Sequence, residues 1–298
     1  MKIEEKIIKR KNEINGVIIA HNYQLPEIQD IADFVGDSLE LSRKAKETDA
    51  DVIIFCGVKF MAETAKILSP EKIVLLPEID AGCPMADMIT ADDVRELRKK
   101  YPDATIVAYV NTNADVKAEV DICCTSSNAV KVVNSVKTER VIFIPDRNLG
   151  SYVKRFTDKE MIIWDGFCPT HNHLITLEDI KTLKDEHPEA LVIVHPECTP
   201  DVIDIADYVA STSGIIKLSK ELNNKEFIIG TEEGIVHRLK KENPEKNFYP
   251  VRKAICYNMK KINLNSLFQA IEKLQYRIEL EKWIIDRAYN AIEKMIKL

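Results

Sequence analysis

The chain has 298 residues, of which 45% are hydrophobic, and its 42 basic and 48 acidic side chains give a net charge of −6. This length allows a substantial core divided into two or three domains, and the interspersed charges argue against a nucleic-acid surface, which would be basic. Residues 1–15 are charged and lack an apolar stretch, and no run approaches the roughly 18 apolar residues that span a membrane. We therefore expect a cytoplasmic protein that binds neither membranes nor nucleic acids.

Short apolar runs and amphipathic stretches alternate along the chain, which predicts an α/β fold with parallel sheets flanked by helices. In the first third we predict helices over residues 2–11, 26–34, 39–46 and 60–68, and strands over 17–20, 52–56 and 73–76. The middle third predicts helices over 91–100, 128–136 and 152–156, strands over 105–110, 141–144 and 160–164, and a turn at 145–150. The last third predicts helices over 177–186, 213–218 and 235–241, strands over 191–194 and 227–231, and an amphipathic helix, broken once, over 266–298.

Three stretches of the chain repeat one another. His21, Tyr109 and His195 stand at the ends of apolar runs and are separated by 88 and 86 residues. A hydroxyl residue follows each of them by 17 positions, and an acidic residue precedes each hydroxyl by five; the hydroxyl residues are Ser38, Ser126 and Thr212, and the acidic residues are Asp33, Asp121 and Asp207. Self-similarity at so long a period indicates repeated small domains. The pattern predicts three homologous small α/β domains around a pseudo-threefold axis with a central cavity, over residues 1–88, 89–174 and 175–263, followed by a helical tail over 264–298.

Three of the seven cysteines follow the same repeat. Cys83, Cys168 and Cys256 are separated by 85 and 88 residues, so they would converge at one end of the cavity. Three thiolates at one point suit a 4Fe–4S cluster or a zinc site, and a cluster with only three protein ligands leaves one iron open to substrate. The alternative is three buried free thiols, which are common in protein cores. The other four cysteines do not follow the repeat and are expected to be structural: Cys56, Cys123, Cys124 and Cys198.

Polar side chains also gather where the repeated strands end. Ligands bind beyond the carboxyl ends of parallel strands, where Tyr23, Asn111 and Glu197 follow the three strand-end residues by two positions. The three hydroxyls stand near predicted helix N-termini, which favour anions, although each could instead be a simple N-cap. Two histidines at equivalent positions, with Tyr23 and Glu197 close by, indicate acid–base chemistry. His171 follows Cys168 by three residues and is expected beside the metal.

Ten short motifs in the chain resemble those of the quinolinate synthase family. They are HNYQLPE (21–27), DFVGDS (33–38), CPM (83–85), YVN (109–111), CTS (124–126), PDRNLG (145–150), CPTH (168–171), HPEC (195–198), GTE (230–232) and CYNM (256–259). The resemblance runs from about residue 15 to about residue 262, and the tail from about Leu264 shows no clear match. Met259 stands where a variant of the family has a second cysteine, so a redox Cys-X-X-Cys pair is absent.

The resemblance implies a reaction and a site. Members of the family condense iminoaspartate with dihydroxyacetone phosphate to quinolinate, releasing phosphate and water, in NAD biosynthesis, and have three α/β domains around a 4Fe–4S cluster. It implies that Cys83, Cys168 and Cys256 hold the cluster, with an open iron as Lewis acid. The implied substrate-binding residues are His21, Ser38, Tyr109, Asn111, Ser126, His171, His195, Glu197 and Thr212. The implied proton-transfer residues are Tyr23, Glu197, His195 and His21, and an iminoaspartate-producing enzyme is the expected functional partner.

Two other functions fit parts of the pattern. One is a simple hydro-lyase that uses an open iron without a condensation step. The other is a non-catalytic metal or iron–sulfur sensor, although a sensor does not need a triplicated set of anion-binding tips, and the chain has no basic output surface.

Overall fold

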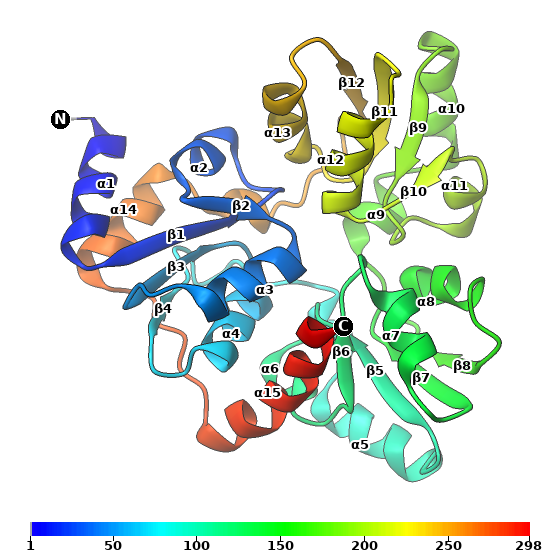
Figure 1. Ribbon diagram of the computed structural model, residues 1–298, viewed down its shortest axis with the longest axis horizontal. Coiled ribbons are helices and arrows are strands. Elements are labelled where there is room, and N and C mark those ends of the chain that lie inside the picture. The colour runs from blue at the N-terminus through cyan, green and yellow to red at the C-terminus, as the bar shows by residue number, and fades with distance from the viewer. Residues whose placement is uncertain (1) are drawn as a thin grey trace.

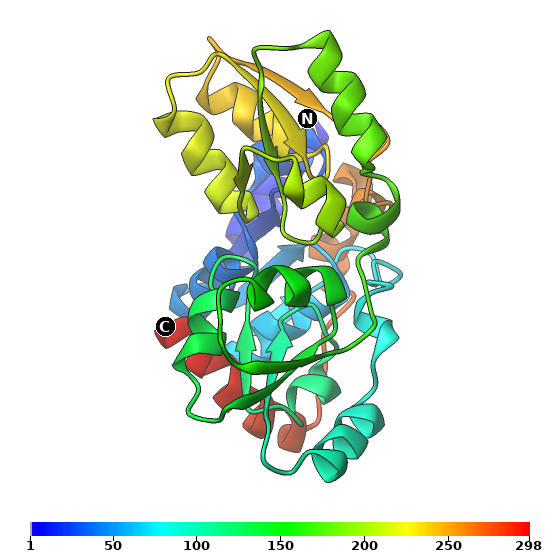
Figure 2. The same ribbon diagram turned by 90° about the vertical axis from the view of Figure 1, so that its right-hand side faces the viewer.

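Three parallel four-stranded sheets organise the computed structural model, which describes residues 2–298. Their strand orders are β2-β1-β3-β4, β6-β5-β7-β8 and β10-β9-β11-β12, so each sheet is built in the same way from four consecutive strands. In Figure 1 the three units surround the centre of the molecule, the first at the left, the second at the lower right and the third at the upper right. Figure 2 shows the third unit above the second in a view turned by 90°. The predicted α/β fold with three repeated units is therefore confirmed.

The units have corresponding elements. The first contains β1 (Gly16–His21), β2 (Phe34–Gly36), β3 (Val52–Cys56), β4 (Ile73–Leu75), α1 (Ile3–Glu13), α2 (Pro26–Ile31), α3 (Ser38–Glu47) and α4 (Lys59–Leu68). The second contains β5 (Thr105–Tyr109), β6 (Ile122–Cys124), β7 (Arg140–Ile144), β8 (Glu160–Ile163), α5 (Ala91–Lys100), α6 (Ala114–Lys117), α7 (Ala129–Ser135) and α8 (Arg147–Lys154). The third contains β9 (Leu191–Val194), β10 (Tyr208–Val209), β11 (Glu226–Gly230), β12 (Asn247–Pro250), α10 (Leu177–Glu186), α11 (Pro200–Asp204), α12 (Thr212–Glu221) and α13 (Ile235–Glu242). The domain boundaries at residues 88, 174 and 263 stay a proposal.

The central strands are apolar along their whole length because helices cover both faces of a parallel sheet. Every residue of β3 is buried, and in β5, β7 and β11 only the first residue is partly exposed. Strands of this kind have no polar face, so the polar groups of each unit are left at the strand ends. This is the reason that the functional side chains gather there.

An aspartate clamp explains the acidic member of the repeat. In each unit the carboxylate accepts a hydrogen bond of 2.8 Å from a backbone N–H of the first strand, and the N–H of the aspartate donates to the carbonyl of the same strand residue. The pairs are Asp33 with Ile18, Asp121 with Ile106, and Asp207 with Val192. The clamp fixes the start of the edge strand against the centre of the sheet, so these aspartates support the fold.

The predicted elements differ from the structure at the short edge strands and at the start of α8. The helix predicted over 26–34 ends at Ile31, because Asp33 turns the chain into the short edge strand β2; β6 and β10 were missed for the same reason. The predicted turn at 145–150 is instead the start of α8, whose N-cap Asp146 accepts a hydrogen bond from Leu149 N–H. Gly150 is inside this helix because a Cβ there would lie 2.7 Å from the Ile163 side chain.

The C-terminal segment forms two helices, as predicted. α14 (Leu264–Lys273) packs on α1, and α15 (Lys282–Lys297) packs on α4, α6 and β6, so that α15 joins the first two units (Figure 1). Ala288, Ala291, Ile292 and Met295 of α15 are buried in this contact. Among the described residues, no helix has both the length and the apolar character needed to cross a membrane.

Candidate active site

A cavity of about 340 Å³ is lined by residues of all three units. Every residue predicted for substrate binding, proton transfer or metal binding lies in its wall. The ends of β1 and β5 and the residues that follow β1, β5 and β9 contribute His21, Tyr23, Tyr109, Asn111, His195 and Glu197, while three loops contribute the cysteines and His171. The repeat therefore brings together side chains that are far apart in the sequence, and their roles remain a proposal.

The two repeated histidines have the same tautomer. Tyr23 N–H donates to His21 Nδ1 at 3.2 Å, and Glu197 N–H donates to His195 Nδ1 at 3.3 Å. Because Nδ1 is the acceptor in both rings, the proton of the neutral imidazole is on Nε2. Burial lowers the pKa of His21 and of His195 to about 3, so both rings are neutral near pH 7. These histidines are hydrogen-bond donors in the cavity.

Two tyrosines supply further donors. The hydroxyl of Tyr23 lies 2.6 Å from Thr231 Oγ1, and Tyr109 is hydrogen-bonded to Glu197. Burial, together with the negative charge of Glu197, raises the pKa of both phenols well above the usual value. Both tyrosines are therefore protonated.

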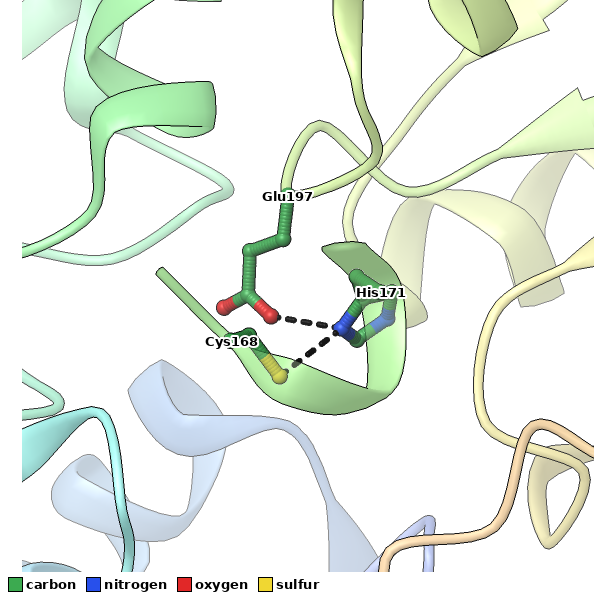
Figure 3. Close-up of side chains that lie close together, drawn as sticks. All are labelled: Cys168, His171 and Glu197. Carbon is green, nitrogen blue, oxygen red and sulfur yellow. Dashed lines mark hydrogen bonds and ion pairs between the residues drawn. The ribbon is translucent and has the colours of Figure 1, made fainter. Parts of the chain in front are cut away.

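Glu197, His171 and Cys168 form a direct hydrogen-bonded group (Figure 3). His171 Nδ1 lies 2.7 Å from Glu197 Oε2 and 3.2 Å from Cys168 Sγ, and Nε2 lies 2.8 Å from Thr231 Oγ1. Nitrogen and oxygen ligands at ~2.0 Å from a tetrahedral zinc ion are roughly 3.3 Å apart, so the histidine–glutamate contact is a hydrogen bond and leaves no space for an ion between them. A zinc ion held by these three residues is not supported.

Glu197 is an ionised carboxylate in this arrangement. Burial on its own would raise the pKa of Glu197, but the adjacent His171 and the hydrogen bonds from His171 and Tyr109 lower it. Asn148 Nδ2 donates to the backbone carbonyl of Glu197 at 3.0 Å and holds the tip in place.

The predicted hydroxyls are not N-caps. Asp37 caps α3 by accepting hydrogen bonds from Leu39 and Glu40 N–H, and Ser211 caps α12. Ser38 and Thr212 are therefore the first residues of their helices, and the N-cap alternative is wrong for both. α7 begins only at Ala129, so Ser126 lies in the turn before it, with Oγ 3.2 Å from His195 Nε2.

The three cysteine loops are docked in the same way. In each unit the backbone N–H of the third residue after the third strand donates to the carbonyl two residues before the cysteine, from Lys59 to Ala81 (2.8 Å), Arg147 to Gly166 (2.8 Å) and Glu233 to Ala254 (3.0 Å). A short helix follows each loop: η1 (Ala86–Met88), α9 (Pro169–His173) and η2 (Met259–Lys261). Backbone N–H groups at these helix starts partly offset the rise in pKa that burial imposes on the thiols, those of Met85 and Ala86 for Cys83, of His171 for Cys168, and of Asn258 and Met259 for Cys256.

The three cysteine sulfurs fit an iron–sulfur cluster. Cys83, Cys168 and Cys256 are free thiols in the cavity wall, whereas the other four cysteines are fully buried within the fold. Hydrogen bonds to the sulfurs tune iron–sulfur clusters, and the three loops place backbone N–H groups near all three thiols. Burial raises the pKa of Cys83 to about 12, so these thiols need a nearby cation in order to ionise. The alternative of three ordinary core thiols agrees less well with their position.

Sequence reasoning missed three residues of the site. Thr231 links Tyr23 to His171, and Asp146 and Glu232 lie next to cysteine loops. The two carboxylates are 86 residues apart, so the repeat itself could have identified them. The repeat could not have identified Thr231, because the residue 86 positions before it is Pro145, which has no hydroxyl.

Fold and cavity together define an α/β protein of three repeated units that brings three thiols and a set of proton donors to one place. A family model described as "Quinolinate synthetase A protein" matches residues 5–297. The quinolinate synthases of Thermodesulfovibrio yellowstonii and Methanoregula boonei are each 54% identical to this chain over 99% of its length, covering 97% and 98% of theirs. The quinolinate synthase of Alkaliphilus metalliredigens is 52% identical over 99% of this chain and 97% of its own.

The chain belongs to the quinolinate synthase family. The family match continues to residue 297, so the expectation that the resemblance ends before the C-terminal tail is wrong. The residues of both tail helices lie within the family match.

Proposed function

We propose that the cavity catalyses the quinolinate synthase reaction, in which iminoaspartate condenses with dihydroxyacetone phosphate to give quinolinate, phosphate and two molecules of water. The atoms balance without an external oxidant or reductant. One observation carries the proposal: three thiols, several neutral proton donors and the Glu197 carboxylate, drawn from all three units, line a single cavity. The names of the relatives support the same activity.

Both substrates are anions, yet none of the residues 2–298 that line the cavity is Lys or Arg. The substrate oxygens would instead be bound by neutral donors, namely the Nε2–H groups of His21 and His195 and the hydroxyls of Tyr23 and Tyr109. Ser38 and Thr212 begin ten-residue helices, and their hydroxyls, together with the N–H groups that the caps Asp37 and Ser211 leave free, would bind carboxylate or phosphate. Ser126 would bind beside His195.

Asn111 offers a hydrogen-bond acceptor to the substrate, in contrast to the donors described above. Its Oδ1 atom is buried and has no hydrogen-bond partner among residues 2–298. A buried acceptor without a donor is unfavourable, so a ligand N–H at this point would be stabilised. The nitrogen of iminoaspartate is the N–H group that the two substrates provide.

Cys83, Cys168 and Cys256 would hold a 4Fe–4S cluster, which supplies an open iron as Lewis acid for a carboxylate or hydroxyl of the substrate. His171 orients Glu197 through the 2.7 Å contact at Nδ1. Glu197, as an ionised carboxylate, would accept protons during imine–enamine tautomerisation and keto–aldo isomerisation. Tyr23, His21 and His195 would donate protons or hydrogen bonds to oxygens that gain negative charge.

This activity would make the chain part of NAD biosynthesis. Iminoaspartate must come from a reaction that forms the imine of aspartate, so an iminoaspartate-producing enzyme is the functional partner that the chemistry requires.

Product analysis tests the proposal. Protein purified and reconstituted without oxygen is incubated with dihydroxyacetone phosphate and with iminoaspartate formed in situ from oxaloacetate and ammonia. We expect quinolinate and phosphate in equal amounts, and only when both substrates are present. Loss of water from one substrate without condensation would identify a hydro-lyase instead, and a cluster-loaded protein without any turnover would favour a sensor.

A further inference from the structure

Two buried carboxylates occupy equivalent places beside the second and third cysteine loops. Asp146 stands two residues after the end of β7, and Glu232 stands two residues after the end of β11. Both side chains belong to residues with no exposed surface, and they are 86 residues apart. A buried carboxylate is costly unless several hydrogen bonds compensate it. The bonds that these two groups make therefore indicate what they hold.

Each carboxylate binds the backbone of a cysteine with one oxygen. Cys168 N–H donates to Asp146 Oδ2 at 3.2 Å, and Cys256 N–H donates to Glu232 Oε1 at 3.1 Å. The second oxygen binds the start of the following helix, through Leu149 N–H at 2.7 Å in one case and Gly234 N–H at 2.8 Å in the other. Each carboxylate thus connects a cysteine directly to the framework of its own unit.

Lys260 strengthens the connection in the third unit. Its Nζ atom lies 2.9 Å from Glu232 Oε1 and donates to the Tyr23 carbonyl at 2.7 Å. Glu232 and Lys260 therefore hold the third cysteine loop against the tip of the first unit. In the second unit, Asp146 is at the same time the N-cap of α8.

The first unit lacks this anchor. Val58 occupies the corresponding position, 88 residues before Asp146, and its side chain cannot accept a hydrogen bond. The Cys83 loop retains the backbone bond from Lys59 N–H to Ala81. A Cβ placed on Gly82 in that loop would meet no atom within 4 Å, so this loop has open space beside it.

We propose that Asp146 and Glu232 are positioning residues for Cys168 and Cys256, holding their backbones so that both sulfurs reach one shared cluster; this rests on the cluster assignment in the proposed function. Loss of either carboxylate frees the cysteine N–H and lets the loop move away from its unit. Changes in groups that orient metal ligands typically cost about 10–100-fold in metal affinity. The loop of Cys83 depends on no carboxylate and is unaffected.

The test compares Asp146→Ala and Glu232→Ala with the wild type. All are reconstituted without oxygen, and the rate of iron release to a ferrous chelator is measured on folded protein. We expect both variants to release iron about tenfold faster or more. Asp146→Asn and Glu232→Gln keep one acceptor oxygen and should lie between the alanine variants and the wild type. Where an alanine variant does not fold, the amide variants decide the question.

Asp121→Asn is the matched control. It changes the same kind of carboxylate-to-backbone bond in the second unit, to Ile106 N–H at 2.8 Å, but does not contact a cysteine loop. We expect it to lower the melting temperature and leave the iron-release rate as in the wild type. Folded Asp146 and Glu232 variants that release iron no faster than the wild type would overturn the inference while leaving the proposed function intact. A wild-type protein that binds no cluster would overturn both.

Discussion

His171 Nδ1 lies 2.7 Å from Glu197 Oε2, and this contact joins the second cysteine loop to the polar tip that follows β9. His171 also lies 3.2 Å from the sulfur of Cys168 and is itself held by Thr231. The carboxylate is thereby fixed at the boundary between the proposed cluster and the substrate space. This position suits a proton acceptor that works on a substrate bound next to the cluster.

Glu197→Gln should separate cluster binding from catalysis. The amide has nearly the same size and still accepts a hydrogen bond, so iron and sulfide content should be retained. It cannot accept a proton, and we expect turnover to fall by about 10²–10⁴-fold. Quinolinate formation and iron content measured on the same sample check this. Wild-type turnover in the variant would remove Glu197 as the proton acceptor.

Stability should decrease in mild acid because two buried histidines stay neutral in the fold. Their pKa is lowered from 6.5 to about 3, so between these values the unfolded chain binds more protons than the folded chain. Above pH 6.5 the two histidines do not lower the free energy of unfolding. As the pH falls from 6.5 toward 3, they lower it progressively. At pH 5 each histidine should lower the free energy of unfolding by about 2 kcal/mol relative to pH 7.

His21→Gln tests this dependence by chemical denaturation at pH 7 and pH 5 without oxygen. The loss of stability between the two pH values should be smaller in the variant by about the contribution of one histidine. Acid effects on the rest of the protein are common to both samples and cancel in the comparison. An identical loss in the two proteins would show that His21 does not have the lowered pKa.

The aspartate clamps should stabilise the fold without affecting the site. Asp207→Ala leaves the buried N–H of Val192 without its 2.8 Å acceptor bond. An unpaired buried donor costs about 1–3 kcal/mol, and we expect the unfolding free energy to fall by that amount. Iron content per folded chain should not change. A variant as stable as the wild type would show that the clamp adds nothing to the fold.

The C-terminal helix should be required for stability. Ile292 is fully buried where α15 packs on the first two units. Ile292→Ala should destabilise the protein by about 2–5 kcal/mol, because it removes apolar contacts and leaves a cavity. Trp283→Ala, at a 45% exposed position of the same helix, is the control and should have a much smaller effect. Equal effects of the two substitutions would contradict this packing role.

The repeat explains why so much of the site could be predicted. His21, Tyr109 and His195 end equivalent strands, and an equal spacing in the sequence becomes an equal place in space when three copies of one fold surround a cavity. The cysteine positions followed from the same register. The three backbone bonds that dock their loops show the physical basis of that register.

What could not be predicted depends on contacts between units or on very short elements. β2 and β10 have three and two residues, too few for a periodic pattern. The link from Tyr23 through Thr231 to His171 joins residues more than 50 positions apart that share no repeat position. The helical form of residues 147–154 was hidden by Gly150, which is present for close packing and does not mark a turn.

The most direct test of the account is the iron and sulfide content of protein purified without oxygen, measured with its visible spectrum. The wild type should contain about four irons and four sulfides per chain, with broad absorption near roughly 400 nm. Cys83→Ala, Cys168→Ala and Cys256→Ala should each lose the cluster and turnover together, while Cys56→Ala, at a buried position in β3, should keep both. Zinc in place of iron, or an active cluster in any of the first three variants, would contradict the account.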